Sequence, residues 1–237
     1  MTVAAARANF SRSFSRYLSE FVYGGIDGSI TTFAVVAGAT GANLDTSIVI
    51  VLGFANLLAD GFSMSIGAFL SAKTNVQRAN KRARAAASLF ESNQTKARER
   101  VITFFQSKGF DGSLLAQNVD FVMHDKERFV NTLVSEANET TERKSPSMVG
   151  WATYVSFILM GLVPLLCFVW DYAIGFNGDK FLWSSLFTGC AFVLIGFLKS
   201  YVTLESIWKG IAETLALGAL AAAVAFFVGD WLEQLVR

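Results

Sequence analysis

The chain has 237 residues, of which 53% are hydrophobic and 16% charged, and its formal net charge is +1. A soluble domain usually carries about 25% charged residues, so this composition excludes an ordinary soluble protein and favours a chain that crosses a membrane several times. The near-zero net charge also argues against a nucleic-acid partner. Cys167 and Cys190 lie in apolar runs and are expected to be buried hydrophobic residues rather than a disulfide or a metal pair.

The N-terminal segment, residues 1–21, has three arginines and no acidic residue before Glu20. This composition resembles a transit peptide. It also fits an amphipathic helix at the membrane surface, because apolar residues recur at helical spacing, at Phe10, Phe14, Leu18 and Phe21. We favour the amphipathic helix.

Five apolar stretches follow, each close to the 20 residues that a helix needs to span the hydrocarbon core. They lie near 22–43, 47–71, 149–171, 182–200 and 207–230. The third contains Pro164, which should kink it. In the fifth, Lys209 and Glu213 are spaced by four and are expected to form a structural ion pair. The sequence therefore predicts an all-α, polytopic membrane protein with five transmembrane helices.

A polar insertion of helical character separates the second span from the third. We divide the chain accordingly into residues 22–72 with helices one and two, a helical domain at 73–146, and residues 147–237 with helices three to five. Lys and Arg are concentrated in the N-terminal segment and at the start of the insertion, which places both on the cytoplasmic side. This orientation suits a bacterial inner membrane and a vacuolar membrane equally well.

Two aspartates, Asp27 and Asp60, lie inside apolar runs. A charged residue at the centre of a membrane helix costs about 2.5–3.5 kcal/mol on insertion scales, so it usually has a partner or a pathway. Asn56, Asp60 and Met64 are spaced by four and share one helical face. Carboxylate oxygens with a thioether suit a borderline divalent ion such as Fe²⁺ or Mn²⁺ better than Ca²⁺ or Mg²⁺.

Other interpretations of these residues stay open. Each aspartate could make a structural hydrogen bond to another span, and Met64 could simply pack. The aspartates could also relay protons, because a low dielectric favours the neutral carboxyl group. In the insertion, glutamates at 136, 139 and 142 would share a helical face, which fits either a cytoplasmic metal-collecting site or a solvated face balanced by Arg143 and Lys144.

Four motifs together resemble the vacuolar iron transporter family: YGGIDGSITTFAVVAGATGA, NLLADGFSMSIGAFLS, FQSKGF and VPLL. The resemblance covers all five spans and the insertion. It implies five transmembrane helices, a cytoplasmic metal-binding domain between helices two and three, and a homodimer with its pathway at the subunit interface. It further implies export of Fe²⁺, and often Mn²⁺, from the cytosol in exchange for protons. The family's motif residues correspond to Asp27 and Met64, whereas Asp60 rests on its spacing alone.

The sequence departs from the family pattern in the insertion and nearby. Many relatives have a Gly-Glu-Tyr motif where Gly67, Ala68 and Phe69 stand here. Of the paired glutamates expected before the FQSKGF motif, Glu99 and at most Glu91 remain. Thr132 and Leu133 replace a methionine pair ahead of Glu136. We therefore expect a divergent member whose reduced cytoplasmic domain retains Glu99 and Glu136 as metal-ligand candidates.

These observations predict a transporter of Fe²⁺ or Mn²⁺ and not an enzyme. No GxxxxGK(S/T) phosphate-binding loop occurs, which argues against an ATP-driven pump. We expect no cofactor other than the transported ion, and as partners membrane lipids, divalent metal ions and a second copy of the chain. The alternative is a non-transporting adaptor or regulatory membrane protein of the same fold.

Overall fold

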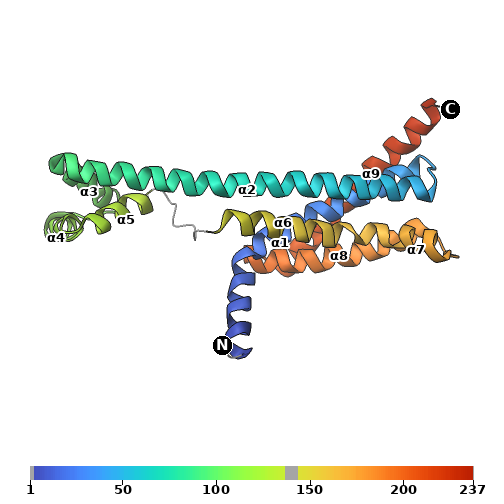
Figure 1. Ribbon diagram of the computed structural model, residues 1–237, viewed down its shortest axis with the longest axis horizontal. Coiled ribbons are helices and arrows are strands. Elements are labelled where there is room, and N and C mark those ends of the chain that lie inside the picture. The colour runs from blue at the N-terminus through green and yellow to red at the C-terminus, as the bar shows by residue number, and fades with distance from the viewer. Residues whose placement is uncertain (1–2, 137–143, 237) are drawn as a thin grey trace. The chain divides into compact units, whose positions relative to one another are not determined.

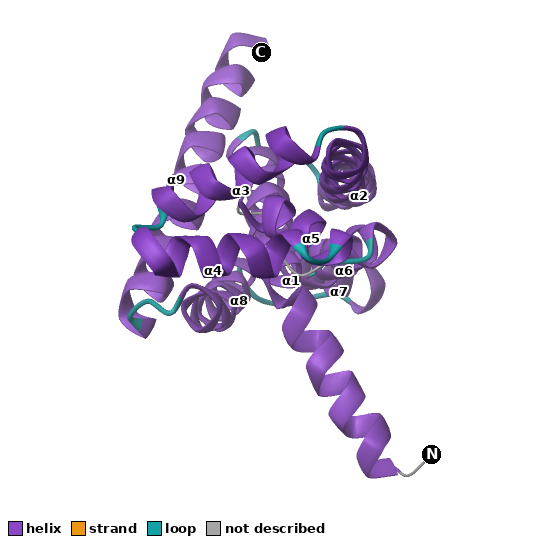
Figure 2. Ribbon diagram, turned by 90° about the vertical axis from the view of Figure 1, so that its left-hand side faces the viewer, coloured by secondary structure: helices purple, strands orange, loops and turns teal. Residues whose placement is uncertain are grey.

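The computed structural model describes the backbone of residues 3–136 and 144–236, and the side chains of 16–135 and 144–236. Within these ranges every regular element is a helix, which confirms the all-α prediction (Figures 1 and 2). The elements are α1 (Val3–Gly41), α2 (Thr46–Ser92), α3 (Gln94–Ser107), α4 (Gly112–Met123), α5 (Lys126–Glu136), α6 (Pro146–Gly161), a 3₁₀ turn (Val163–Leu165), α7 (Leu166–Ile174), α8 (Lys180–Thr203) and α9 (Ile207–Val236).

The chain forms two compact units. The membrane unit comprises Met1–Phe69 and Pro146–Arg237, and the polar unit comprises Leu70–Ser145. The division falls within α2, whose first half belongs to the membrane unit and whose second half belongs to the polar unit.

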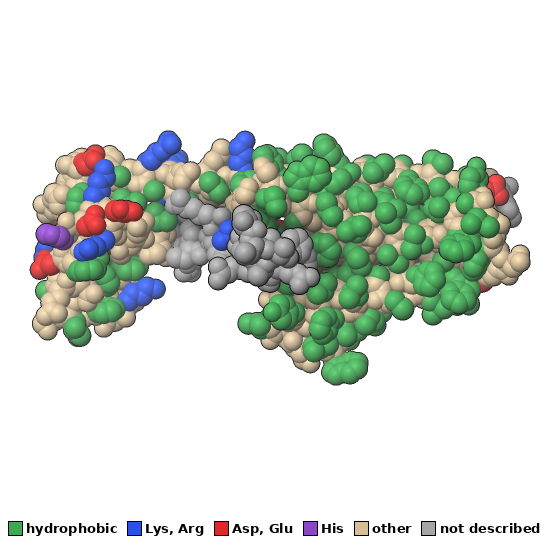
Figure 3. Space-filling model, turned by 60° about the horizontal axis from the view of Figure 1, so that its bottom comes forward, with side chains coloured by type: hydrophobic (Ala, Val, Ile, Leu, Met, Phe, Trp, Pro, Cys, Tyr) green, Lys and Arg blue, Asp and Glu red, His purple; other side chains and the backbone are tan. Residues whose placement is uncertain are grey.

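Five helical segments in the described residues are long and apolar enough to cross a bilayer, so the protein is an integral membrane protein. They are Arg16–Gly41, Thr46–Ser92, Pro146–Ile174, Lys180–Thr203 and Ile207–Val236. The visible face of the membrane unit, at the right of Figure 3, is mostly hydrophobic, as contact with lipid requires.

The N-terminal segment is not a separate helix, because α1 continues without a break from Val3 into the first span. Leu18 and Val22 are buried and pack against Ile195 of α8. The end of the predicted amphipathic segment therefore belongs to the core of the membrane unit, while Phe10 and Phe14 lie outside the residues whose side chains are described.

α1 is the central helix of the membrane unit and packs against α6, α8 and α9. Its glycines allow this close approach, because a Cβ on Gly28 would lie 2.4 Å from the carbonyl oxygen of Phe157 in α6. The first half of α2 joins the same core, where Val49 and Leu57 pack with Val36 and Phe157. The small residues thus serve packing within one bundle.

Pro164 interrupts the third span as predicted, and a 3₁₀ turn separates α6 from α7. Because proline has no N–H, the carbonyl group of Met160 loses its helical partner. The Ser29 hydroxyl of α1 donates to that carbonyl oxygen at 3.2 Å. The Ser184 hydroxyl of α8 donates to the carbonyl oxygen of Pro164 at 2.6 Å. Two neighbouring helices therefore satisfy the break.

A polar cluster joins three helix ends at the C-terminal end of the third span, where α7 ends. The Asp171 carboxylate accepts hydrogen bonds from Lys180 Nζ at 2.9 Å and from Thr46 Oγ1 at 3.2 Å. It also accepts the backbone N–H of Phe176 at 3.2 Å. This carboxylate connects the end of α7 with the starts of α2 and α8.

The polar unit has its own hydrophobic core, formed by Ala86, Ala97, Val101, Val119, Val122 and Phe129. Ion pairs on its surface join α3 to α4 through Arg98 and Asp120, 2.6 Å apart, and α2 to α5 through Glu91 and Lys126. Figure 3 shows charged side chains of both signs gathered on this unit. Its fold therefore rests on apolar packing and surface ion pairs.

Candidate metal site

Asp27 lies in α1 and is half-buried within the first span. Its backbone carbonyl oxygen accepts a hydrogen bond from Thr31 Oγ1 at 2.8 Å. Its carboxylate has no hydrogen-bond or ion-pair partner among the described residues. Among the described residues, therefore, no donor bonds to this carboxylate.

Asp60 lies in α2, and its carboxylate is close enough to Asp27 to interact with it electrostatically. The fold therefore places the two aspartates that the sequence analysis singled out within electrostatic range of each other. Two like charges repel each other strongly in a low dielectric, and a cation or a proton between them would relieve the repulsion.

The three residues of the predicted α2 face differ in exposure. Met64 is half-buried and packs against the apolar cluster that contains Phe157. Asn56 is half-buried, and its amide nitrogen is shielded from solvent without a hydrogen-bond partner in the described part. Asp60 is exposed. The face is therefore half-buried at Asn56 and Met64 and exposed between them, at Asp60.

Thr32 is a polar residue that the sequence analysis missed. It is fully buried, and its hydroxyl oxygen has no hydrogen-bond partner among the described residues. The oxygen lies beside Gly161, where α1, α2 and α6 meet, since Leu57 contacts the same glycine. Thr31 and Thr40 of the same helix donate to the carbonyl four residues earlier, so the sequence offered no signal that Thr32 would differ.

The exposed surface of α2 near Asp60 includes polar and small residues among apolar side chains such as Ile66 and Leu70. Ser63 and Gly67 are exposed, and no atom lies within 4 Å of a Cβ placed on Gly67. A single chain therefore leaves a carboxylate and a hydroxyl uncovered in a segment that crosses the membrane.

The polar unit shows no metal centre in the residues that the structure describes. No group of three or more His, Cys, Asp or Glu residues gathers there. Glu99 lies on α3 and is exposed. Glu136 ends α5, but its side chain lies outside the described residues, as do Glu139 and Glu142. The proposed cytoplasmic collecting site therefore stays a prediction.

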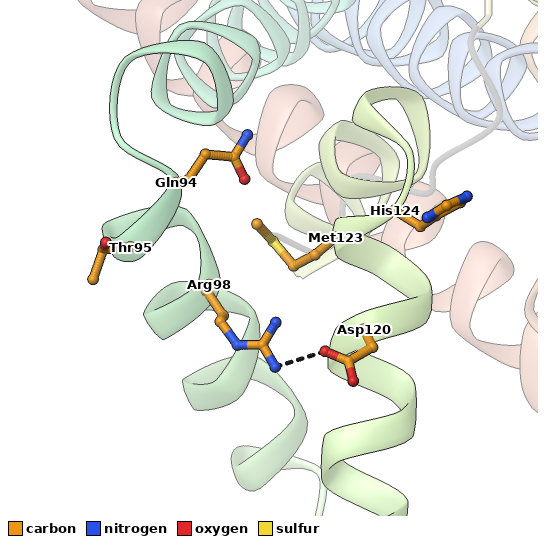
Figure 4. A pocket seen from close by; sticks show the side chains of 6 residues that line it. All are labelled: Gln94, Thr95, Arg98, Asp120, Met123 and His124. Atoms are coloured by element: carbon orange, nitrogen blue, oxygen red, sulfur yellow. Dashed lines mark hydrogen bonds and ion pairs between the residues drawn. The ribbon is translucent and has the colours of Figure 1, made fainter.

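A pocket of about 500 Å³ does occur in the polar unit, between α3 and α4 (Figure 4). It is lined by Gln94, Thr95, Arg98, Asp120, Met123 and His124. Arg98 points toward Asp120 and is bonded to it, whereas the His124 ring points away from the other labelled side chains. The only carboxylate of the pocket is thus already paired with a cation.

Comparison with known proteins agrees with this architecture. The VIT family model matches residues 18–230, which include the five spans and the polar unit. The chain belongs to the VIT family. Within it, the chain is similar to the vacuolar iron transporter of Toxoplasma gondii, with 29% identity over 97% of this chain and 79% of that protein.

Plant members of the VIT family are similar over slightly less of the chain. Vacuolar iron transporter 1 of Eucalyptus grandis is 26% identical over 87% of this chain and 83% of that protein. Vacuolar iron transporter 1 of Arabidopsis thaliana is 25% identical over 87% of this chain and 82% of that protein. These relatives are named as transporters, in agreement with the prediction that the chain is not an enzyme.

Proposed function

We propose that this VIT-family chain transports a divalent first-row metal ion, Fe²⁺ or Mn²⁺, out of the cytosol, with Asp27, Asp60 and Met64 as ligands in its pathway. The proposal is supported by two carboxylates on α1 and α2 that lie within electrostatic range of each other and have no hydrogen-bond or ion-pair partner among the described residues. The names of the relatives, which are vacuolar iron transporters, support the substrate class.

The chemistry of the ligands favours this ion class. Anionic oxygens at membrane depth offset the cost of removing water from a divalent cation. The thioether of Met64 adds a softer ligand, which Fe²⁺ and Mn²⁺ accept more readily than Ca²⁺ or Mg²⁺. Protonation of the carboxylates would remove their charge and release the ion, so the same pair would couple transport to a proton gradient by antiport.

A second copy of the chain would cover the exposed side of α2. Asp60 and Ser63 would otherwise face hydrocarbon, where unpaired polar groups are costly. The exposed Gly67 permits close approach of another helix. We therefore propose a homodimer in which the pathway lies at the subunit interface.

The orientation follows from the basic residues of the connecting segments. We propose that the N-terminus and the polar unit lie in the cytosol, whether the membrane is vacuolar or a bacterial inner membrane. Ions would then reach the aspartates from the side on which the polar unit lies.

Uptake of Fe²⁺ and Mn²⁺ into proteoliposomes, with and without a pH gradient, tests the proposal. We expect Asp27→Asn and Met64→Leu to lower metal flux by about tenfold or more, as is typical when a metal site is disrupted. Matched controls are Asp45→Asn and Met148→Leu, which change exposed residues outside the site and should retain flux.

Wild-type flux in both site variants would refute the pathway assignment. No metal flux in the wild-type protein would instead favour the non-transporting adaptor. If a site variant folds but loses metal flux, while its matched control retains flux, the non-transporting adaptor function is excluded.

A further inference from the structure

α2 becomes strongly basic directly after its apolar part. Between Asp60 and Glu91 no acidic residue occurs, and five basic residues follow Leu70: Lys73, Arg78, Lys81, Arg82 and Arg84. All five are exposed. We call this set the basic face of α2.

The opposite side of the same helical segment is apolar and covered. Small apolar residues recur there at intervals of three or four and are buried or half-buried, at Ala72, Val76, Ala79, Ala83 and Ala86. Ala86 belongs to the hydrophobic core of the polar unit, and the basic residues occupy the exposed remainder of the helix.

Three other cations of the polar unit pair with carboxylates: Arg98 with Asp120, Lys126 with Glu91, and Arg128 with Asp125. In contrast, Arg78, Lys81 and Arg84 have no ion-pair partner among the residues that the structure describes. The basic face therefore carries positive charge that the described fold leaves available to an external anion.

We propose that the basic face of α2 binds anionic phospholipid headgroups of the leaflet that adjoins the polar unit. The face continues, in one unbroken helix, the segment that crosses the membrane. At about 1.5 Å rise per residue, Lys73 lies about 5 Å, Arg78 about 12 Å and Arg84 about 21 Å along the axis from Leu70. The long side chains of the nearer residues can reach the headgroups, and clusters of four to eight Lys or Arg beside a membrane helix attract anionic lipid electrostatically.

The position of the basic face favours lipid over nucleic acid, because the face follows the membrane-crossing part of α2 directly along the same helix. This inference does not depend on the metal pathway. It uses only the continuity of α2 and the cations Arg78, Lys81 and Arg84, which no described acid neutralises.

The test uses the purified full-length protein in detergent and counts bound lipid molecules by native mass spectrometry. Phosphatidylglycerol is the anionic probe and phosphatidylcholine the zwitterionic control. The test variant is R78Q/K81Q/R84Q. The matched control, K96Q/R100Q/K108Q, removes the same charge from exposed positions on and beside α3. Metal flux in proteoliposomes of phosphatidylcholine alone is measured in parallel.

We expect the wild-type protein to prefer phosphatidylglycerol over phosphatidylcholine. The affinity of the test variant for phosphatidylglycerol should fall by about fivefold or more, and its binding of phosphatidylcholine should not change. The preference should disappear at high salt. The control should resemble the wild type. Retained flux in the test variant would separate this inference from the transport proposal.

Equal wild-type affinity for the two lipids would overturn the inference, even if the test variant failed to fold. If phosphatidylglycerol binding weakened equally in the test variant and in the control variant, the inference would be overturned as well. The loss would then follow from the lower net charge and not from the position of the cations. If soluble glycerophosphate displaced bound phosphatidylglycerol as effectively as added phosphatidylglycerol does, the face would be assigned to small soluble anions instead of lipid. Tighter binding of a single-stranded oligonucleotide than of phosphatidylglycerol would assign the face to nucleic acid.

Discussion

Two aspartates of the membrane unit differ completely in their surroundings. The Asp171 carboxylate accepts three hydrogen bonds, including one from the Lys180 ammonium group. The Asp27 carboxylate accepts none from described residues and lies within electrostatic range of the like charge of Asp60. An acid that the fold does not need for its own bonding is available for a ligand.

This difference predicts opposite effects of the same substitution on stability. Asp27→Asn should leave the thermal unfolding midpoint unchanged or raise it, because the repulsion from Asp60 disappears. Asp171→Asn should lower the midpoint, because the charged partner of Lys180 is lost. Unfolding in detergent micelles without metal measures both, and a large loss of stability in Asp27→Asn would show that this carboxylate serves the fold.

The hydroxyl group of Ser29 leads to a second prediction, which concerns the break at Pro164. Its hydroxyl is the donor that replaces the missing N–H of Pro164 at the carbonyl of Met160. We expect Ser29→Ala to cost about 1–3 kcal/mol, since a buried carbonyl would be left unsatisfied.

Ser185→Ala is the matched control for Ser29→Ala. Ser185 donates to the carbonyl of Phe181 within its own helix, so its loss should change the free energy of unfolding little. Equal effects of the two substitutions in chemical unfolding would contradict the role given to Ser29.

At the scale of the elements, helix packing depends on where glycine is required. A Cβ on Gly28 would lie 2.4 Å from the carbonyl oxygen of Phe157 and so force α1 and α6 apart. A Cβ placed on Gly189 of α8 would have no atom within 4 Å. The two positions are both helical, and only their neighbours distinguish them.

Substitution by alanine should separate these positions. Gly28→Ala is expected to destabilise the membrane unit by about 1–3 kcal/mol through overpacking. Gly189→Ala should be neutral or stabilise by about 0.5–1 kcal/mol, because alanine favours the helix. Thermal unfolding of both variants checks this, and a stable Gly28→Ala protein would contradict the close contact of α1 with α6.

At the scale of the whole molecule, the exposed polar side of α2 predicts self-association. In a background with Cys190→Ala, a cysteine at Ser63 should form a cross-linked dimer with a short bifunctional reagent, since native Cys167 is buried. A cysteine at Leu217, exposed on α9, serves as the lipid-facing control.

Gel electrophoresis in detergent and after reconstitution reads out the result. Cross-linking at position 63 alone supports the homodimer. Equal cross-linking at both positions would indicate random collision, and none at position 63 would place the subunit contact elsewhere.

The amino-acid sequence by itself determined the five apolar helices, the polar insertion and the break at Pro164. These features depend on local composition, on the length of apolar runs and on a missing N–H, all of which act within one segment. It also singled out Asp27 and Asp60, because a charge in an apolar run is costly wherever the helix packs.

Only the tertiary structure decided which residues meet. It placed Asp27 and Asp60 within electrostatic range of each other, left Asp60 exposed, and buried Thr32 without a partner among the described residues. The predicted pair of Lys209 and Glu213 does form, at 4.0 Å, but Lys199 of α8 approaches Glu213 more closely, at 2.6 Å. Such contacts join residues distant in the chain, and helix packing, which no local pattern encodes, determines their geometry.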